Sequence, residues 1–198
     1  AIREYGFNNL RSLQEITLPP NLRIIEFCGF SECVALRSVT LPNSVTTVGS
    51  NAFSNCSALT TATLSSGMTT VPDSMFFADK NLRTVILPEG ITTICDTAFM
   101  NCGFREFTIP ASVRKIEIGS FAGCTSMKKF IVEEGNTAYK AIDGVLFTAD
   151  GTHLVCYPAY KTGSYVVPEG TLYIDYDAFR ENGYLSGITF PSTLRKID

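Results

Sequence analysis

Apolar residues recur along the chain in one fixed order, at a spacing of about 23 residues. The clearest marker is an apolar residue followed by proline, found at Leu18-Pro19, Leu41-Pro42, Leu87-Pro88, Ile109-Pro110, Val167-Pro168 and Phe190-Pro191, with Leu64 and Val132 in the same place without the proline. Successive markers lie 23 residues apart, except for one step of 22 and one of 35. A fixed period in this range is typical of a solenoid, in which stacked repeats share one core.

Two further columns keep the same register. Phenylalanine fills one position, here named the Phe column: Phe7, Phe30, Phe53, Phe76, Phe99, Phe121 and Phe179. Three residues later comes the Cys column: Leu10, Cys33, Cys56, Asp79, Cys102, Cys124 and Asn182. Chance does not align several independent columns at one period, so the pattern reflects repeated structural units.

Each repeat predicts a short strand and a return segment. In "LRSVTLP", Val39 and Leu41 alternate with Ser38 and Thr40, which is the two-residue period of a strand. Proline ends this strand because it cannot donate to a ladder. The next stretch, "SVTTVGSNAF", is too short and too β-branched for a stable α-helix. It predicts a second extended segment or one helical turn.

The long step places an insert within residues 133–166. The apolar runs "VLF" and "HLVCY" flank Ala149-Asp150-Gly151-Thr152, and Asp-Gly is a strong hairpin signal. We expect one domain over residues 1–198, with a β-hairpin in this repeat. The chain starts and stops inside a repeat and neither end resembles a polar cap. Both ends therefore look truncated, and either flanking repeats or domains are expected, or pairing of the ends with a second chain.

Composition and charge narrow the classes of function. Apolar residues make up 45% of the chain, enough for a large core. A net charge of −3 and a pI of about 5.2 argue against a nucleic-acid partner bound by a broad basic surface. No apolar run approaches the ~20 residues that a membrane-spanning helix needs. No signal peptide leads this segment, which says nothing about its compartment.

The titratable residues do not form a convincing catalytic, cofactor or metal site. Stacked Cys side chains point the same way, which suits a disulfide poorly, and the seven cysteines are an odd number. We expect them to be small buried apolar groups. His153 and Cys156 supply only two zinc ligands, and no compelling nucleophile lies near His153 in the sequence. The prediction is a protein without enzymatic activity, cofactor or metal.

The face of the predicted strands is the best candidate for binding. One outward column is basic on an otherwise acidic chain and is named the basic stripe: Arg37, Thr60, Arg83, Arg105 and Lys128, with Lys129 beside it. It predicts an electrostatic binding surface for an acidic protein segment or a glycan. The alternative is that these charges only keep an exposed sheet in solution.

A possible secondary patch lies in the insert, where four tyrosines cluster: Tyr139, Tyr157, Tyr160 and Tyr165. Tyrosine favours interfaces because it is large and carries a polar tip. Packing of the insert onto the edge of the solenoid explains the cluster at least as well.

The repeat resembles the BspA-type leucine-rich repeats of the 23-residue class, whose consensus is close to LxxIxIPxxVxxIGxxAFxxCxx. The resemblance is carried by "LRSVTLPNSVTTVGSNAFSNCSA" (36–58) and "VILPEGITTICDTAFMNC" (85–102), and it covers almost the whole chain. The insert is similar to the hairpin that recurs in this family. Asp79 and Asn182 depart from the consensus in the Cys column.

This resemblance implies an α/β-type leucine-rich-repeat solenoid, mostly β, built as a right-handed stack of about eight coils. Family members are typically bacterial surface or secreted proteins that adhere to host or bacterial proteins, and the family has no catalytic residues to carry over. The expectation is an extracellular or cell-surface adhesion module that binds an unidentified surface or matrix protein, or a glycan, through its concave strand face. The alternative is a structural spacer in a larger cell-surface protein.

Overall fold

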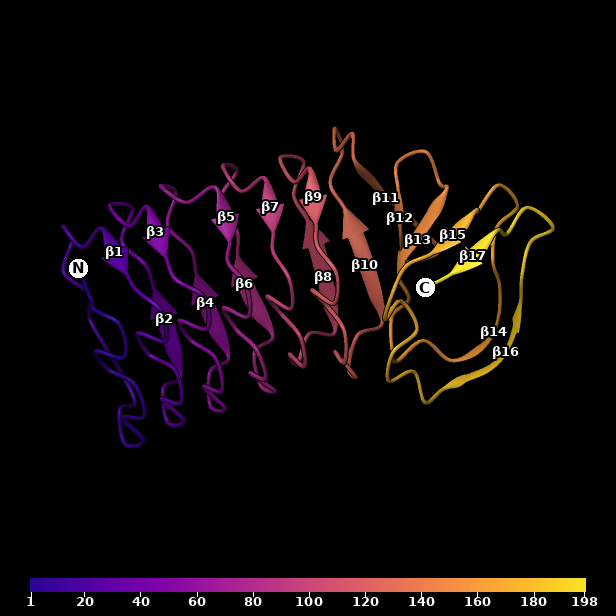
Figure 1. The fold of residues 1–198 in the computed structure, drawn as a ribbon. Helices are drawn as coiled ribbons and strands as arrows, with labels where there is room; N and C mark the ends of the chain where they lie inside the picture. Colours follow the sequence, from indigo (N-terminus) through magenta and orange to yellow (C-terminus); the bar gives the residue numbers. More distant parts are fainter.

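The computed structural model describes residues 1–198 as a stack of coils made of short strands and turns, without a helix (Figure 1). The predicted solenoid is confirmed, and the return segment is extended. The structure accordingly contains no apolar helix of membrane-spanning length.

The strands of the first coils form two rows. The primary row holds the strands before the proline position: β2 (Ser38–Thr40), β4 (Thr61–Thr63), β6 (Thr84–Ile86), β8 (Glu106–Ile109) and β10 (Lys129–Val132). The return row holds β1 (Ile24–Ile25), β3 (Thr47–Val48), β5 (Thr70–Val71), β7 (Thr93–Ile94) and β9 (Lys115–Ile116).

Parallel pairing keeps the register of the repeat within each sheet of a row. Val39 pairs with Ala62 and Ala62 with Val85, so each apolar position stacks on its counterpart in the next coil. Val39 is buried, whereas Ser38 and Thr40 on either side of it are exposed. The alternation read from the sequence therefore separates the core from the solvent face, as a strand period requires.

The Phe column forms the centre of the core. Consecutive rings from Phe7 to Phe121 stack with centroids 5.2 to 5.8 Å apart. Rings at this distance gain aromatic contact in addition to burial. The rings from Phe30 to Phe99 are fully buried and belong to a core cluster of 36 residues.

The turn around each phenylalanine has a left-handed residue on both sides of it. The residues two before the ring include Cys28, Asn51, Ser74, Thr97 and Gly119, and those two after it include Asn9, Asn55, Ala78, Asn101 and Gly123. Asparagine and glycine tolerate positive φ better than other residues, which explains their frequency here. This pair of positions bends the chain around the ring in every coil.

The insert forms a three-stranded antiparallel sheet. β12 (Val145–Thr148) pairs with β13 (His153–Cys156) around the Asp-Gly turn, so the predicted hairpin is confirmed. A further strand, β11 (Tyr139–Ile142), pairs with the other edge of β12. β13 then continues in parallel into β15 (Tyr173–Ile174) and β17 (Lys196–Ile197), while β14 (Gly163–Val166) pairs with β16 (Leu185–Thr189).

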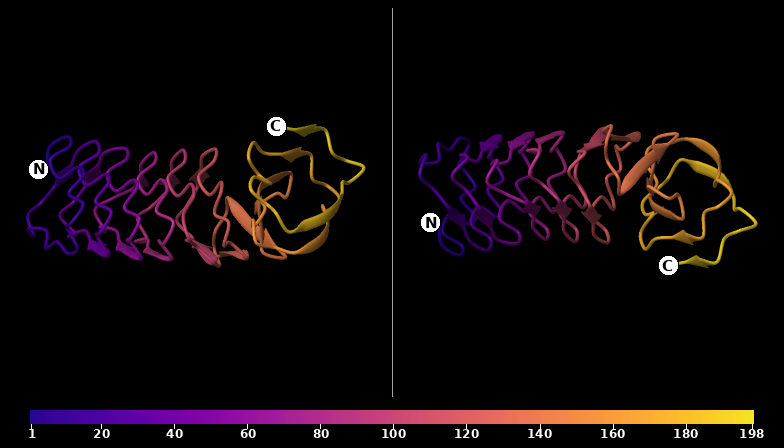
Figure 2. Two further views of the ribbon diagram at one scale, coloured as in Figure 1. Left: turned by 90° about the horizontal axis from the view of Figure 1, so that it is seen from below. Right: turned by 90° about the horizontal axis from the view of Figure 1, so that it is seen from above.

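β12 divides the apolar interior into two clusters. Leu146 packs into the large N-terminal cluster, while its neighbours Val145 and Phe147 belong to a second cluster of eight residues under the last coils. Both views in Figure 2 show these last coils turned relative to the row of N-terminal coils.

The primary row is interrupted between β6 and β8. β2, β4 and β6 form one sheet and β8 and β10 another. The return row is divided at a different place, between β3 and β5, and is continuous through β5, β7 and β9. The interruption coincides with the repeat that is one residue short. In it, Phe104 and Phe107 replace Leu82 and Val85 of the preceding coil, and their rings meet edge to face at 4.9 Å. We attribute the lost pairing to the shorter turn and to these larger rings, because a packed core cannot absorb added volume without a shift of the backbone.

Candidate binding surface

Backbone hydrogen bonds between coils place the basic stripe along the start of the primary row. Thr60 N donates to Arg37 O at 2.9 Å, Arg83 N to Thr60 O at 3.0 Å, and Lys128 N to Arg105 O at 2.8 Å. These bonds hold the side chains of successive coils beside one another. All six residues of the predicted face, Arg37, Thr60, Arg83, Arg105, Lys128 and Lys129, are exposed.

Four of the cations on this face have no acidic partner. Arg37, Arg83, Arg105 and Lys128 take part in no salt bridge, whereas Lys129 lies 3.4 Å from Glu106. Lys128 instead lies over the ring of Tyr160, 5.3 Å from its centroid. The stripe therefore carries uncompensated positive charge at the surface of an acidic protein.

The tyrosine cluster is not an exposed patch, because three of its members are buried. Tyr139, Tyr157 and Tyr165 are 8%, 2% and 6% exposed. The hydroxyl of Tyr139 accepts a hydrogen bond from Ile116 N at 2.7 Å. This bond gives a partner to a main-chain N–H of β9, the last strand of the return row. The rings of Tyr157 and Tyr165 meet edge to face at 4.9 Å in the smaller core cluster. These three side chains fix the insert to the solenoid.

Tyr160 is the one member of the cluster on the surface. It is 39% exposed, packs against Tyr184 with ring centroids 4.7 Å apart, and lies beside Lys128. Tyr160 N donates to Met127 O at 2.7 Å. Because Met127 directly precedes Lys128, this bond holds Tyr160 of the insert next to the end of the stripe. Tyr160 and Tyr184 therefore extend the basic stripe at one end instead of forming a separate patch.

The cysteines are free thiols. In the Cys column, Cys33, Cys56, Cys102 and Cys124 each donate the S–H to the carbonyl of a Phe-column residue in an earlier coil, at 3.1 to 3.2 Å. Burial raises the pKa of the Cys124 thiol to about 12. The four cysteines of the column thus act as small buried side chains, each with a weak S–H donor. Asn182 makes a similar contact, since its side-chain amide donates to the carbonyl of Pro158 at 3.1 Å.

Asp79 is the member of the Cys column that the sequence did not explain. Its side chain is fully buried, and one carboxyl oxygen accepts from Cys56 N at 2.7 Å while the other has no partner. Burial raises the pKa of Asp79 well above its ordinary value. It lies within the core, so its effect is on stability.

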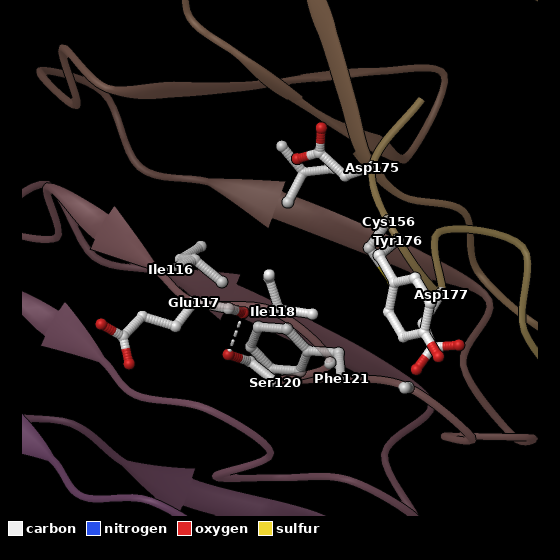
Figure 3. A pocket seen from close by; sticks show the side chains of 12 residues that line it. Ile116, Glu117, Ile118, Ser120, Phe121, Cys156, Asp175, Tyr176 and Asp177 are labelled. Carbon is white, nitrogen blue, oxygen red and sulfur yellow. Dashed lines mark hydrogen bonds between the residues drawn. The ribbon is translucent and has the colours of Figure 1, made fainter. Parts of the chain in front are cut away.

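A small cavity lies where the coil of β9 meets the coils of the insert. It measures about 50 Å³ and its lining includes Ser120, Cys156, Asp175 and Asp177 (Figure 3). The Ser120 hydroxyl donates to the carbonyl of Glu117 at 2.6 Å, and burial raises the pKa of Cys156. The Cys156 thiol lies 3.9 Å from the carbonyl of Tyr157, so both side chains contact carbonyl oxygens and neither is hydrogen-bonded to the base that an activated nucleophile needs.

Two other groups of titratable residues lie on the surface. His153 Nδ1 is 2.8 Å from Asp175 and its ring stacks on Tyr173, so it pairs with a carboxylate of the next coil. The side chains of Asp73, Cys95 and Glu117 place their potential ligand atoms within 4.8 Å of one another. Lys115 and the Asp96 N–H already engage Glu117, and Lys115 lowers the pKa of its carboxyl.

The repeated primary strand, the turn around the Phe column and the Cys column agree with one known family of repeats. The BspA type leucine rich repeat region matches in six copies, over residues 1–139 and 155–198. The chain belongs to this family. The residues between the two matched ranges include β12 and parts of β11 and β13, so the match leaves out most of the hairpin insert of this BspA-type domain.

Solved structures of bacterial leucine-rich-repeat proteins have the same fold. A leucine rich cell surface protein from Faecalibacterium prausnitzii is 31% identical, with a TM-score of 0.88 over 98% of this chain and 53% of its own. The pneumococcal vaccine antigen PcpA is 26% identical, with a TM-score of 0.72 over 82% of this chain and 47% of its own. A leucine-rich repeat protein from Eubacterium ventriosum, 24% identical at a TM-score of 0.69, shows the fold alone.

The BspA-type domain thus spans about half the length of these structures. No protein with a curated description matches it. The comparisons identify a leucine-rich-repeat module of the kind found in bacterial surface proteins.

Proposed function

We propose that this BspA-type domain is a non-enzymatic binding module, displayed outside the cell or on its surface, that recognises an acidic segment of a host or bacterial surface or matrix protein. The observation that carries the proposal is the basic stripe, with four exposed cations that lack acidic partners on a chain of net charge −3. A surface of this kind steers an acidic partner and orients it on contact.

The arrangement of the charges supports recognition over simple solubility. Arg105 and Lys128 occupy equivalent positions of adjacent coils, and like charges on neighbouring strands of a ladder repel one another. Solubility would be served equally well by charges of alternating sign, which would attract across the ladder. A negatively charged ligand offsets this repulsion when it binds. The repulsion between the two cations in the free protein therefore favours the bound state.

The test is a binding screen against immobilised extracellular-matrix proteins, plasma proteins and glycans. The wild type is compared with a variant in which Arg37, Arg83, Arg105 and Lys128 are all changed to Ser. A matched control replaces four exposed cations near the return row, Arg23, Arg114, Arg195 and Lys196, and therefore changes the net charge equally. We expect salt-sensitive binding of an acidic protein by the wild type and the control, and loss of binding in the stripe variant.

A structural spacer is the second candidate, favoured by the continuous core that joins the N-terminal coils. It predicts that the strand face tolerates substitution and that the wild type captures nothing. Binding that survives equally in both charge variants would contradict the proposed role of the stripe, and capture of sulfated glycans alone would change the class of ligand.

A further inference from the structure

The interruption of the primary row leaves a groove on the strand face. The groove measures about 180 Å³ and lies between β6 and β8, which Figure 1 shows as neighbouring strands of the row. Val85, Phe104 and Phe107 contribute apolar surface to it, and Arg83, Glu106 and Thr108 are among its other lining residues. It therefore opens in the middle of the basic stripe.

Main-chain groups beside the groove lack the partners that they have in the neighbouring coils. The carbonyls of Arg37, Thr60 and Arg105 each accept a hydrogen bond from the next coil, but the carbonyl of Arg83 accepts none, and the Arg105 N–H that would reach it has no acceptor. The rung at the other end of the strand is also missing.

At that end, Leu41 N donates to Thr63 O and Leu64 N donates to Ile86 O, at 2.9 and 3.0 Å. Leu87 N, at the same position of the next coil, donates to no acceptor. Unpaired N–H and C=O groups along a strand edge are a template for another strand. Here the template lies inside the solenoid wall and not at its end.

The side chains around the groove favour one kind of occupant. Arg83 borders it and Arg105 lies immediately before β8, and both guanidinium groups lack an acidic partner. The one carboxylate in the lining, Glu106, is 3.4 Å from Lys129. Ile86 beside the groove is 53% exposed. An extended peptide with acidic side chains on one face and aliphatic side chains on the other matches this arrangement, because alternate residues of a strand face opposite ways.

We propose that this groove binds an extended acidic peptide by β-strand addition, with the free main-chain groups of Arg83, Leu87 and Arg105 supplying the hydrogen bonds. The aliphatic side chains of the peptide contact Val85, Phe104 and Phe107, and its carboxylates pair with Arg83 and Arg105. Main-chain pairing supplies affinity and the pockets for alternate side chains supply selectivity in this mode of recognition. The inference rests on the proposed function for the charge of the ligand and adds the way in which its backbone is held.

The test uses a fluorescently labelled hexapeptide of alternating glutamate and valine, followed by anisotropy. Two comparison peptides separate the contributions: one with lysine in place of glutamate, and one with N-methyl groups on the amides that would pair with the strand edges. We expect the lysine peptide not to bind. The loss of one or two hydrogen bonds should make the N-methylated peptide about tenfold weaker.

A matched pair of variants locates the site. Thr108→Trp fills the groove from β8, whereas Thr40→Trp places the same ring at the equivalent, exposed position of β2, where the ladder is intact. The first should weaken the glutamate–valine peptide about tenfold and the second should leave it within about twofold. Hydrogen exchange of wild-type protein should show that the amides of Leu87 and Arg105 become protected when the peptide is added.

Equal binding of the parent and N-methylated peptides would overturn strand addition, as would equal effects of the two Trp variants, or no binding of the peptide at all. Each of these results leaves the proposed function standing if the fourfold Ser variant still loses an acidic protein that the wild type captures. Loss of the proposed function would appear instead as equal capture by the wild type and the stripe variant.

Discussion

Single residues in the Cys column show how strictly the repeat constrains its interior. Cys33, Cys56, Cys102 and Cys124 each donate to the carbonyl of a Phe-column residue, and Asn182 donates instead to the carbonyl of Pro158. The sequence identified the column, and its small buried character is confirmed. It did not reveal the bond, since that depends on the carbonyl of a residue in another coil.

The buried carboxyl of Asp79 should make the protein less stable as the pH rises. Because its pKa is raised in the folded state, the unfolded chain releases this proton near its ordinary pKa of about 3.9 while the folded protein still holds it. The unfolded state binds fewer protons in that range, so stability falls as pH rises from about 4 towards the pKa of the folded state.

Asp79→Cys, which restores the residue of the repeat consensus, should therefore stabilise the protein at pH 7. Removal of the unpartnered buried oxygen contributes about 1–3 kcal/mol, and loss of the acceptor for Cys56 N offsets part of this gain. The gain should shrink towards pH 4. Chemical denaturation of both proteins over this range measures it, and parallel curves with no difference at pH 7 would show that the carboxyl finds a partner in solution.

The elements of the fold were largely predictable from the sequence because their pattern repeats. The primary strands follow from the alternation around Val39, and the hairpin of β12 and β13 follows from Asp150-Gly151. β11 was missed because nothing in "YKAI" separates a strand from a loop when only one edge pairs. The gap between β6 and β8 was also missed, since the apolar register continues through it and the lost pairing arises from the ring volumes of Phe104 and Phe107.

The division into buried and exposed positions predicts very different losses of stability for two substitutions in neighbouring coils. Phe53→Ala removes a fully buried ring from the stack and should cost roughly 3–5 kcal/mol of unfolding free energy. Arg83→Ala removes an exposed side chain with no hydrogen bond or salt bridge and should change it by less than about 0.5 kcal/mol. Thermal or denaturant unfolding compares them, and equal losses would mean that the stripe is structural.

The whole molecule is held by contacts between neighbouring coils, and its two core clusters meet at β12. The surface of the basic stripe was predicted residue by residue, because the repeat fixes which positions point outward. The burial of the tyrosine cluster was not predicted residue by residue, since the sequence alone does not say whether an insert packs inward or outward. Three of its four members turned out to be buried.

This division predicts a local response to a core substitution. Phe147 is fully buried in the smaller cluster, so Phe147→Ala should loosen the C-terminal coils first, because each coil of a solenoid depends mainly on its neighbours. Hydrogen exchange should show lost protection in β14 and β16 and little change in β4 and β5. Uniform loss along the chain would instead indicate that all coils unfold together.

The buried, hydrogen-bonded thiols of the Cys column affect how readily the protein is oxidised. Desolvation is the main cause that raises the pKa of all seven cysteines. Peroxides and disulfides react with the thiolate, which these residues scarcely populate at neutral pH. The buried cysteines of the Cys column should therefore react slowly with peroxides and disulfides, although the chain has an odd number of thiols.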